Sequence, residues 1–189
     1  MQITEEEWQD ICSFQWKCTK SHAWKEFCWK NTVRFFITPH VKSHYDKGGS
    51  RCWRNCGCQV ANHYHIFWAC RNIVNYWTDI HQAIQIIFKA QIPFDFKTMY
   101  LGLSPPELTD TDTYLIGILL AAGKKALTKR WLLPSIPSLD NWIDVTYEIY
   151  KMEKITFSLN LKMDSFLQHW GKWTRYIEPM RPDLVKIRP

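Results

Sequence analysis

Four of the seven cysteines of this chain lie with two histidines in one short segment, and these side chains are the ones that Zn²⁺ prefers. The segment reads Cys52-Trp-Arg-Asn-Cys56-Gly-Cys58-Gln-Val-Ala-Asn-His63-Tyr-His65-Ile-Phe-Trp-Ala-Cys70. A closed structural zinc site needs four such ligands around a tetrahedron. Two ligands from a tight turn and two from the following segment would complete the site, and only a short stretch of chain would have to become ordered. We therefore predict that this segment binds zinc.

The spacing favours one set of four ligands. Gly57 directly follows Cys56, and glycine permits a turn in which the sulfurs of Cys52 and Cys56 face one point. His65 and Cys70 are separated by four residues, the gap of retroviral-type CCHC knuckles. The residues after Cys70 look helical, and a helix N-terminus favours the thiolate that a metal requires. The predicted ligands are Cys52, Cys56, His65 and Cys70, with Cys58 and His63 as possible substitutes.

Two alternatives to metal binding exist for these cysteines. Free cysteines are often simply buried, but such clustering is unusual for ordinary core residues. A disulfide framework fits poorly because the cysteine count is odd, no Asn-x-Ser/Thr acceptor occurs, and no apolar segment follows a basic start. We expect an intracellular protein, in the cytoplasm or nucleus.

The composition is that of a globular protein. Of the 189 residues, 46% are hydrophobic and 22% charged, and most of the 11 tryptophans must be core residues. The net charge of +6 attracts anionic partners, nucleic acid among them. The longest uncharged apolar run, residues 113–123, is shorter than the roughly 20 residues of a membrane helix, so we expect no membrane partner.

Hydrophobic residues recur at helical spacing along most of the chain, which predicts an all-α fold: a helical domain with a small inserted CCHC zinc knuckle. Thr4 and Glu7 form a capping-box pattern, and Ser21 and Ser138 are further N-cap candidates. An extended piece is expected at 94–100, between prolines. The expected helices span 4–14, 24–36, 73–89, about 110–133, 138–157 and 164–177.

These patterns divide the chain into four parts. Residues 1–50 form an N-terminal helical segment that ends in a polar loop, and residues 51–92 hold the knuckle and the helix after it. Residues 93–177 form a C-terminal helical region, and the proline-rich residues 178–189 a loose tail.

Basic and aromatic residues indicate where a nucleic acid would bind. Several cations near the end of the 110–133 helix could clamp phosphates, although cations there also offset the helix dipole. Around the knuckle, arginines could hold a backbone while aromatic rings stack on unpaired bases, unless those rings only cover the metal. The candidate contacts are Arg51, Trp53, Arg54, Lys124, Lys125, Lys129 and Arg130.

No pattern typical of an enzyme occurs in the sequence. It lacks a glycine-rich phosphate loop, a His-Glu-x-x-His motif and an adjacent Asp-Asp pair. Four protein ligands would leave the predicted zinc no position for water. We therefore expect no enzymatic activity from this chain.

The cysteine–histidine block resembles the zinc-binding segment after the reverse transcriptase in LINE-type (non-LTR) retrotransposon polyproteins. The upstream stretch Trp24-Lys-Glu-Phe-Cys-Trp-Lys-Asn-Thr-Val-Arg-Phe-Phe36 is similar to the sequence before that segment. Downstream, three runs resemble the C-terminal region of the same second open reading frame: Gly117-Ile-Leu-Leu-Ala-Ala-Gly-Lys-Lys-Ala126, Asp140-Asn-Trp-Ile143 and Tyr147-Glu-Ile-Tyr-Lys-Met-Glu-Lys154. The similarity covers nearly the whole chain.

The resemblance implies a knuckle associated with RNA binding, in a region attached to polymerase and endonuclease domains that this chain lacks. It maps the ligands to Cys52, Cys56, His65 and Cys70. The spacing before His65 is one residue longer than in the mammalian version. The implied partners are RNA or another single-stranded nucleic acid and the reverse transcriptase domain of a parent polyprotein. The alternatives are a protein-interaction scaffold that zinc only staples, or a non-functional fragment.

Overall fold

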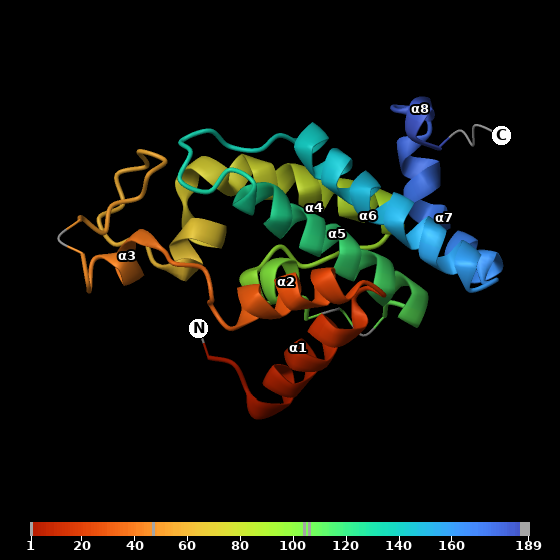
Figure 1. Cartoon of the computed structure of the whole chain (residues 1–189), viewed down its shortest axis with the longest axis horizontal. Helices are drawn as coiled ribbons and strands as arrows, with labels where there is room; N and C mark the ends of the chain where they lie inside the picture. Colours follow the sequence, from red (N-terminus) through yellow and green to blue (C-terminus); the bar gives the residue numbers. More distant parts are fainter. Residues whose placement is uncertain (1, 47, 104, 106, 186–189) are drawn as a thin grey trace.

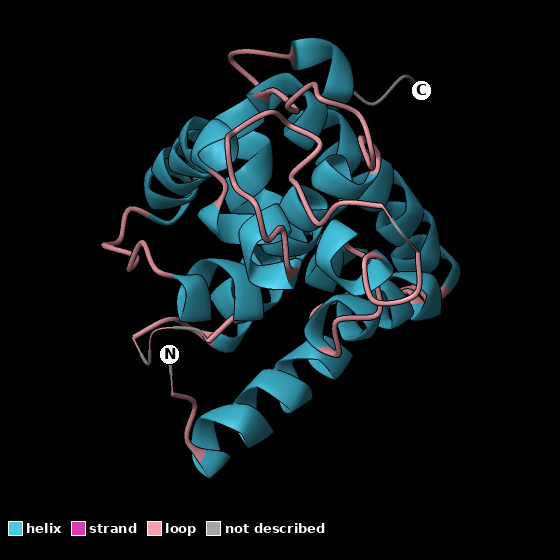
Figure 2. Cartoon of the chain, turned by 90° about the vertical axis from the view of Figure 1, so that its left-hand side faces the viewer, coloured by secondary structure: helices cyan, strands magenta, loops and turns pink. Residues whose placement is uncertain are grey.

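The computed structural model describes residues 2–46, 48–103, 105 and 107–185. All regular elements within these ranges are helical, as Figure 2 shows, so the predicted all-α class is confirmed. The elements are α1 (Glu5–Lys17), α2 (His22–Thr32), α3 (Pro39–Lys42), η1 (His65–Ala69), η2 (Arg71–Ile73), α4 (Val74–Phe88), η3 (Lys97–Leu101), α5 (Asp110–Thr128), α6 (Leu139–Leu159), α7 (Met163–Ile177) and α8 (Pro182–Val185).

Helices α1, α5 and α6 begin at polar caps, whereas α4 follows Ile73 and has no side-chain cap. Thr4 and Glu7 form the predicted capping box of α1, and Ser138 forms another with Asn141 at α6. Thr109 caps α5 by accepting a hydrogen bond from the backbone N–H of Asp112. Each cap satisfies backbone donors that have no partner inside the helix.

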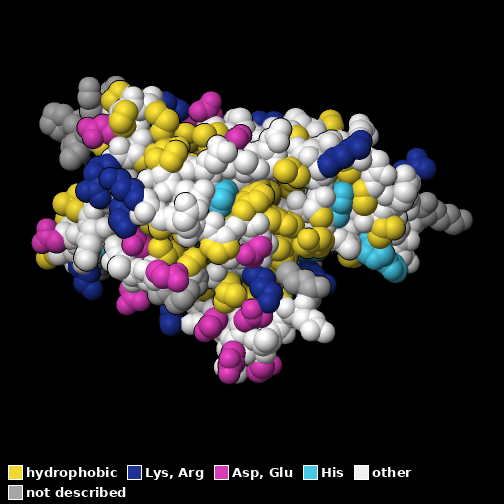
Figure 3. Space-filling model, turned by 180° about the vertical axis from the view of Figure 1, so that it is seen from behind, with side chains coloured by type: hydrophobic (Ala, Val, Ile, Leu, Met, Phe, Trp, Pro, Cys, Tyr) yellow, Lys and Arg dark blue, Asp and Glu magenta, His cyan; other side chains and the backbone are white. Residues whose placement is uncertain are grey.

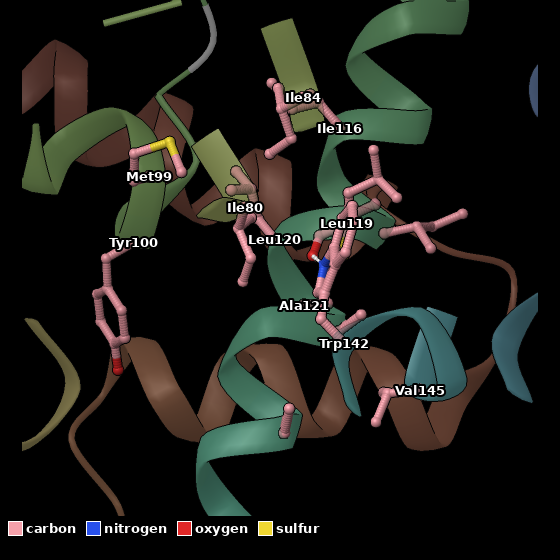
Figure 4. Packing of buried hydrophobic residues seen from close by; sticks show 14 of the residues in the cluster. Ile80, Ile84, Met99, Tyr100, Ile116, Leu119, Leu120, Ala121, Trp142 and Val145 are labelled. Atoms are coloured by element: carbon pink, nitrogen blue, oxygen red, sulfur yellow. Dashed lines mark hydrogen bonds between the residues drawn. The ribbon is translucent and has the colours of Figure 1, made fainter. Parts of the chain in front are cut away.

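Helix α5 occupies the centre of the molecule and packs against α1, α4, α6 and α7 (Figure 1). Small residues let its neighbours approach closely. A Cβ on Gly117 would lie 2.7 Å from that of Cys18, and one on Gly123 would lie 3.1 Å from the Trp77 ring. In Figure 4, side chains of α4 and α5 meet Trp142, whose indole N–H donates to the carbonyl of Leu119 at 2.9 Å.

Two sequence-based expectations about the secondary structure before Cys52 were wrong. Helix α2 ends at Thr32 and not at 36, because Arg34 adopts a left-handed backbone (φ 57°) and Phe35 N–H closes the turn onto the Lys30 carbonyl. After this turn, the Phe36 ring packs against those of Phe67 and Trp131. Pro39 opens α3, so a helical turn precedes the rest of the polar loop expected at the end of residues 1–50.

The expected extended piece at 94–100 contains a π-helical turn instead, Lys97–Leu101. Its residues Met99, Tyr100 and Leu101 are buried, and Gly102 ends it in a left-handed conformation (φ 82°). A side chain on Gly102 would overlap the Phe14 ring, which explains the glycine. Because three successive residues are buried, their hydrophobic pattern does not alternate as it does in a half-buried strand. The sequence pattern therefore does not identify the secondary structure of this segment.

Buried residues from the segments 1–50, 51–92 and 93–177 join one hydrophobic core, so the segments pack together. At the C-terminal end, α8 contacts α7, while the last four residues of the predicted tail and Lys47 of the predicted loop lie outside the described residues. None of the described helices is long and apolar enough to span a membrane.

Candidate metal centre

The first half of the site is a tight loop closed by backbone hydrogen bonds. Cys52 N–H donates to the carbonyl of Cys58 at 3.2 Å, and Asn55 N–H donates to that of Cys52 at 3.3 Å. Asn55 and Gly57 have positive φ angles of 55° and 85°, which bend the chain around Cys56. The turn predicted from Gly57 is therefore present, although two residues and not one adopt the left-handed backbone.

The second half of the site is carried by two short helical turns ahead of α4. His65 begins η1, and its backbone N–H donates to the side-chain oxygen of Asn62 at 2.9 Å. Cys70 follows η1 and is the N-cap of η2, which leads directly into α4. The sequence-based expectation that Cys70 stands at a helix N-terminus is confirmed.

These two halves bring four metal-ligating side chains together. The three Sγ atoms and the ring nitrogen of Cys52, Cys56, His65 and Cys70 all lie within 4.8 Å of one another. Cys56 Sγ is 3.3 Å from His65 Nε2. The cysteines are buried and His65 is partly buried, so water has little access to the ligand atoms.

The surroundings set the protonation of the cluster. Burial raises the pKa of Cys52 to about 12, and the neighbouring Cys70 adds to this. Burial acts in the same direction on Cys56, but hydrogen bonds from the Cys58 backbone and from the Cys52 and Cys70 thiols outweigh it, so its pKa is lowered. Burial, together with the Arg54 cation, lowers the pKa of His65, which favours the neutral imidazole that a metal ligand requires.

The structure places both possible substitutes elsewhere. Cys58 is partly exposed and donates its thiol hydrogen bond to the carbonyl of Val60. His63 is a core residue, with Nε2 2.6 Å from the Tyr100 hydroxyl and its ring 4.6 Å from that of Phe67. Burial lowers the pKa of His63 to about 4, so it is packed as a neutral ring.

The candidate nucleic-acid contacts of the knuckle occupy different environments. Arg54 is 3% exposed, and its guanidinium donates to the carbonyl of Ile66 at 2.7 Å, so the expectation that it holds a nucleic-acid backbone was wrong. Trp53 packs its ring on that of Trp131 at 4.8 Å, in the segment that follows α5. Arg51 is exposed, and its Nε donates to the side chain of Gln59.

The four basic residues expected to clamp phosphates do not share one surface. Lys124 is 1% exposed and donates to the Tyr100 carbonyl inside the core, so it was wrongly assigned. Lys125 lies 4.9 Å from the Phe27 ring, and Lys129 pairs with Glu148 at 2.7 Å. The guanidinium of Arg130 instead donates to Ser135 and Asn141.

Sequence reasoning missed two side chains that shape the site. Asn62 supports His65, and Asn72 donates to the Arg54 carbonyl at 2.6 Å, tying the first loop to the start of α4. The Asn-x-x-His spacing of the first is a helix-cap pattern and could have been recognised. The second joins residues 18 positions apart and left no local signal.

A search against protein-family models finds no family that matches this chain.

Proposed function

We propose that Cys52, Cys56, His65 and Cys70 bind one Zn²⁺ as a closed structural site. The convergence of the four ligand atoms within 4.8 Å carries this proposal. With the usual Zn–S and Zn–N bond lengths, a tetrahedral site separates a sulfur from a nitrogen ligand by about 3.5 Å. The 3.3 Å between Cys56 Sγ and His65 Nε2 is already close to that value.

The donor set supports zinc over other cations. Three thiolates and one imidazole are soft and borderline ligands, which suit Zn²⁺ and disfavour Mg²⁺ and Ca²⁺. Four protein ligands complete the coordination shell, so the ion would have no position for a reacting water. Its role would be to fasten the loop at 52–58 to the start of α4, as an inserted zinc knuckle.

We further propose that this module binds single-stranded nucleic acid, with RNA as the first candidate. The net charge of +6 supports an anionic partner. Arg51 and Arg71 are exposed on either side of the cluster in sequence, and aromatic rings near it are partly exposed, Tyr64 among them. Cations beside accessible rings are the combination that single strands require.

The parent context is a proposal that depends on the sequence resemblance. The cysteine–histidine block and the Tyr147–Lys154 run support assignment to the C-terminal part of a LINE-type reverse transcriptase polyprotein. In that setting the module would hold element RNA near the polymerase, inside the cell.

Elemental analysis of the purified chain tests the zinc proposal. We expect one zinc per chain, lost in Cys52→Ser and retained in Cys58→Ser, because only the first removes a sulfur from the cluster. Cys58→Ser is the matched control, since it makes the same chemical change six residues away. A metal-free wild-type protein that is folded, or equal loss in both variants, would refute the assignment.

Fluorescence anisotropy with a labelled single-stranded RNA tests the second proposal. We expect binding whose affinity falls with salt, and the double variant Arg51→Gln, Arg71→Gln should reduce the slope of log K against log salt by about 1 to 2. Zinc content should not change. If the zinc-loaded wild-type chain does not bind, the interaction-scaffold alternative is favoured.

A further inference from the structure

A small aromatic pocket lies directly beside the candidate metal centre. It has a volume of about 160 Å³ and opens to the surface. Tyr64 and Trp68 come from the segment between the metal ligands, and Phe94 comes from the loop after α4. The remaining lining residues are Ala69, Val74 and Trp77.

The rings of the pocket are held in place from behind. Trp68 lies 5.8 Å from Trp77, whose indole N–H donates to the buried carbonyl of Phe67. Phe94 lies 5.3 Å from Trp68 and 4.9 Å from the His81 ring. Tyr64 and Phe94 are each 44% exposed, so a guest can reach two ring faces at the rim.

The volume restricts the guest to one ring system. Pockets for whole small molecules usually measure about 300–1,000 Å³, and this one is well below that range. Planar walls favour a flat guest, because aromatic rings attract one another when stacked with an offset or edge to face.

Two lining residues of the pocket and one neighbour in sequence carry polar groups without a protein partner in the described part of the chain. Among the described residues, neither the Tyr64 hydroxyl nor the Trp68 indole N–H has a hydrogen-bond partner. The guanidinium of Arg71, between pocket residues Ala69 and Val74 in sequence, is also free of a carboxylate. It reaches toward the knuckle, 3.9 Å from where a Cβ on Gly57 would lie.

From these contacts we propose that the pocket receives one unpaired nucleobase of a bound single strand. The base stacks between Phe94 and Tyr64, the Trp68 N–H donates to an acceptor on the base edge, and Arg71 contacts the adjoining phosphate. This inference rests on the nucleic-acid binding proposed above and names the site of that binding. A flat guest with edge acceptors and a neighbouring negative charge matches all three features of the pocket.

Binding of the zinc-loaded full chain to single strands, intact or with abasic positions, tests the proposal. Phe94→Ala should weaken binding of the intact strand roughly tenfold, because stacking on one aromatic residue contributes about that factor. The salt slope should stay unchanged, since no phosphate contact is lost. Trp16→Ala is the control, because it removes another exposed aromatic side chain, from α1, outside the pocket.

A fully abasic strand separates a base contact from an indirect effect. It should bind more weakly to the wild-type protein, and Phe94→Ala should cause no further loss. If Phe94→Ala weakens intact and abasic strands equally, or leaves the intact strand unaffected, the pocket proposal is refuted while nucleic-acid binding stands. Failure of the wild-type chain to bind any single strand would instead refute the proposed function.

Discussion

The loop that carries Cys52 and Cys56 and the helical bundle are ordered by different means. In the bundle of α4–α7, Trp77, Trp142, Trp170 and Trp173 are at most 1% exposed, and burial of such large rings stabilises the packing. The loop at 50–64 has no helix of its own before its last residues, and Asn55, Gly57 and Val60 are exposed. Its compactness depends on a few backbone hydrogen bonds, on the anchoring of Arg54 and His63 to the rest of the chain, and on the converging ligands.

This difference means that stability should be lost in separate parts. A region held by apolar burial unfolds with the whole domain, while a loop held by one ion can open when that ion leaves.

Figure 3 shows a band of hydrophobic side chains across the rear face, with Lys and Arg at separate points among Asp and Glu. On that face, charge is not concentrated as it would be in a phosphate clamp.

The largest expected effect is that of metal removal. Zinc contributes roughly 10–16 kcal/mol in small zinc-finger peptides, so a chelator should loosen the loop at residues 52–58. Hydrogen exchange measured by mass spectrometry should show fast exchange there and continued protection in α5 and α6. If the loop stayed protected from exchange without metal, packing and hydrogen bonds alone would be holding it, as they hold the bundle.

The second effect concerns Glu153, a buried carboxylate in the bundle that sequence reasoning did not single out. It accepts hydrogen bonds from Thr19, the Lys20 backbone, Tyr114 and Trp170. Glu153→Ala leaves these donors without a partner, so we expect a loss of about 3 kcal/mol or more in the free energy of unfolding. Thermal unfolding monitored by circular dichroism measures it.

Zinc content should not change in Glu153→Ala, because none of the hydrogen bonds that are lost involves a residue of the 52–70 segment. Glu148→Gln, also on α6 but exposed and paired with Lys129, is the matched control and should cost less than about 1 kcal/mol. Loss of metal from Glu153→Ala would contradict the separation of the two regions.

The smallest effect is expected from Lys124→Met. The variant loses a hydrogen bond to the Tyr100 carbonyl but also removes a buried ammonium group, so stability should change by no more than about 1 kcal/mol in either direction. RNA affinity and its salt slope should match the wild type, in contrast to the exposed Arg51→Gln. A reduced salt slope in Lys124→Met would show that Lys124 does contact phosphate, as the sequence led us to expect.

The sequence was informative where the signal was local. The capping residues Thr4 and Ser138 and the helical repeat before Lys89 depend on neighbours within a few residues, and the ligand candidates fall into two pairs that are each close in sequence. Such patterns can be read from one chain because the interacting groups are close in sequence.

The environment of charged residues could not be predicted in the same way. Arg54 and Lys124 look like surface cations, yet each finds a carbonyl acceptor in a buried position. The partner of Lys124 lies 24 positions away, in a π-helical turn that has no periodicity to reveal it. Packing of Trp53 on Trp131 likewise joins segments that only the tertiary fold brings together.

Cys70 belongs to the ligand cluster and also precedes η2 and α4 without any intervening loop. Each residue added to or removed from a helix turns everything beyond it by about 100°. An insertion between Cys70 and Trp77 would therefore point the knuckle toward another side of the bundle. Among proteins with this arrangement, chain length should be invariant across that junction, whereas the loop that includes Gly48 and Gly49 is free to grow or shrink.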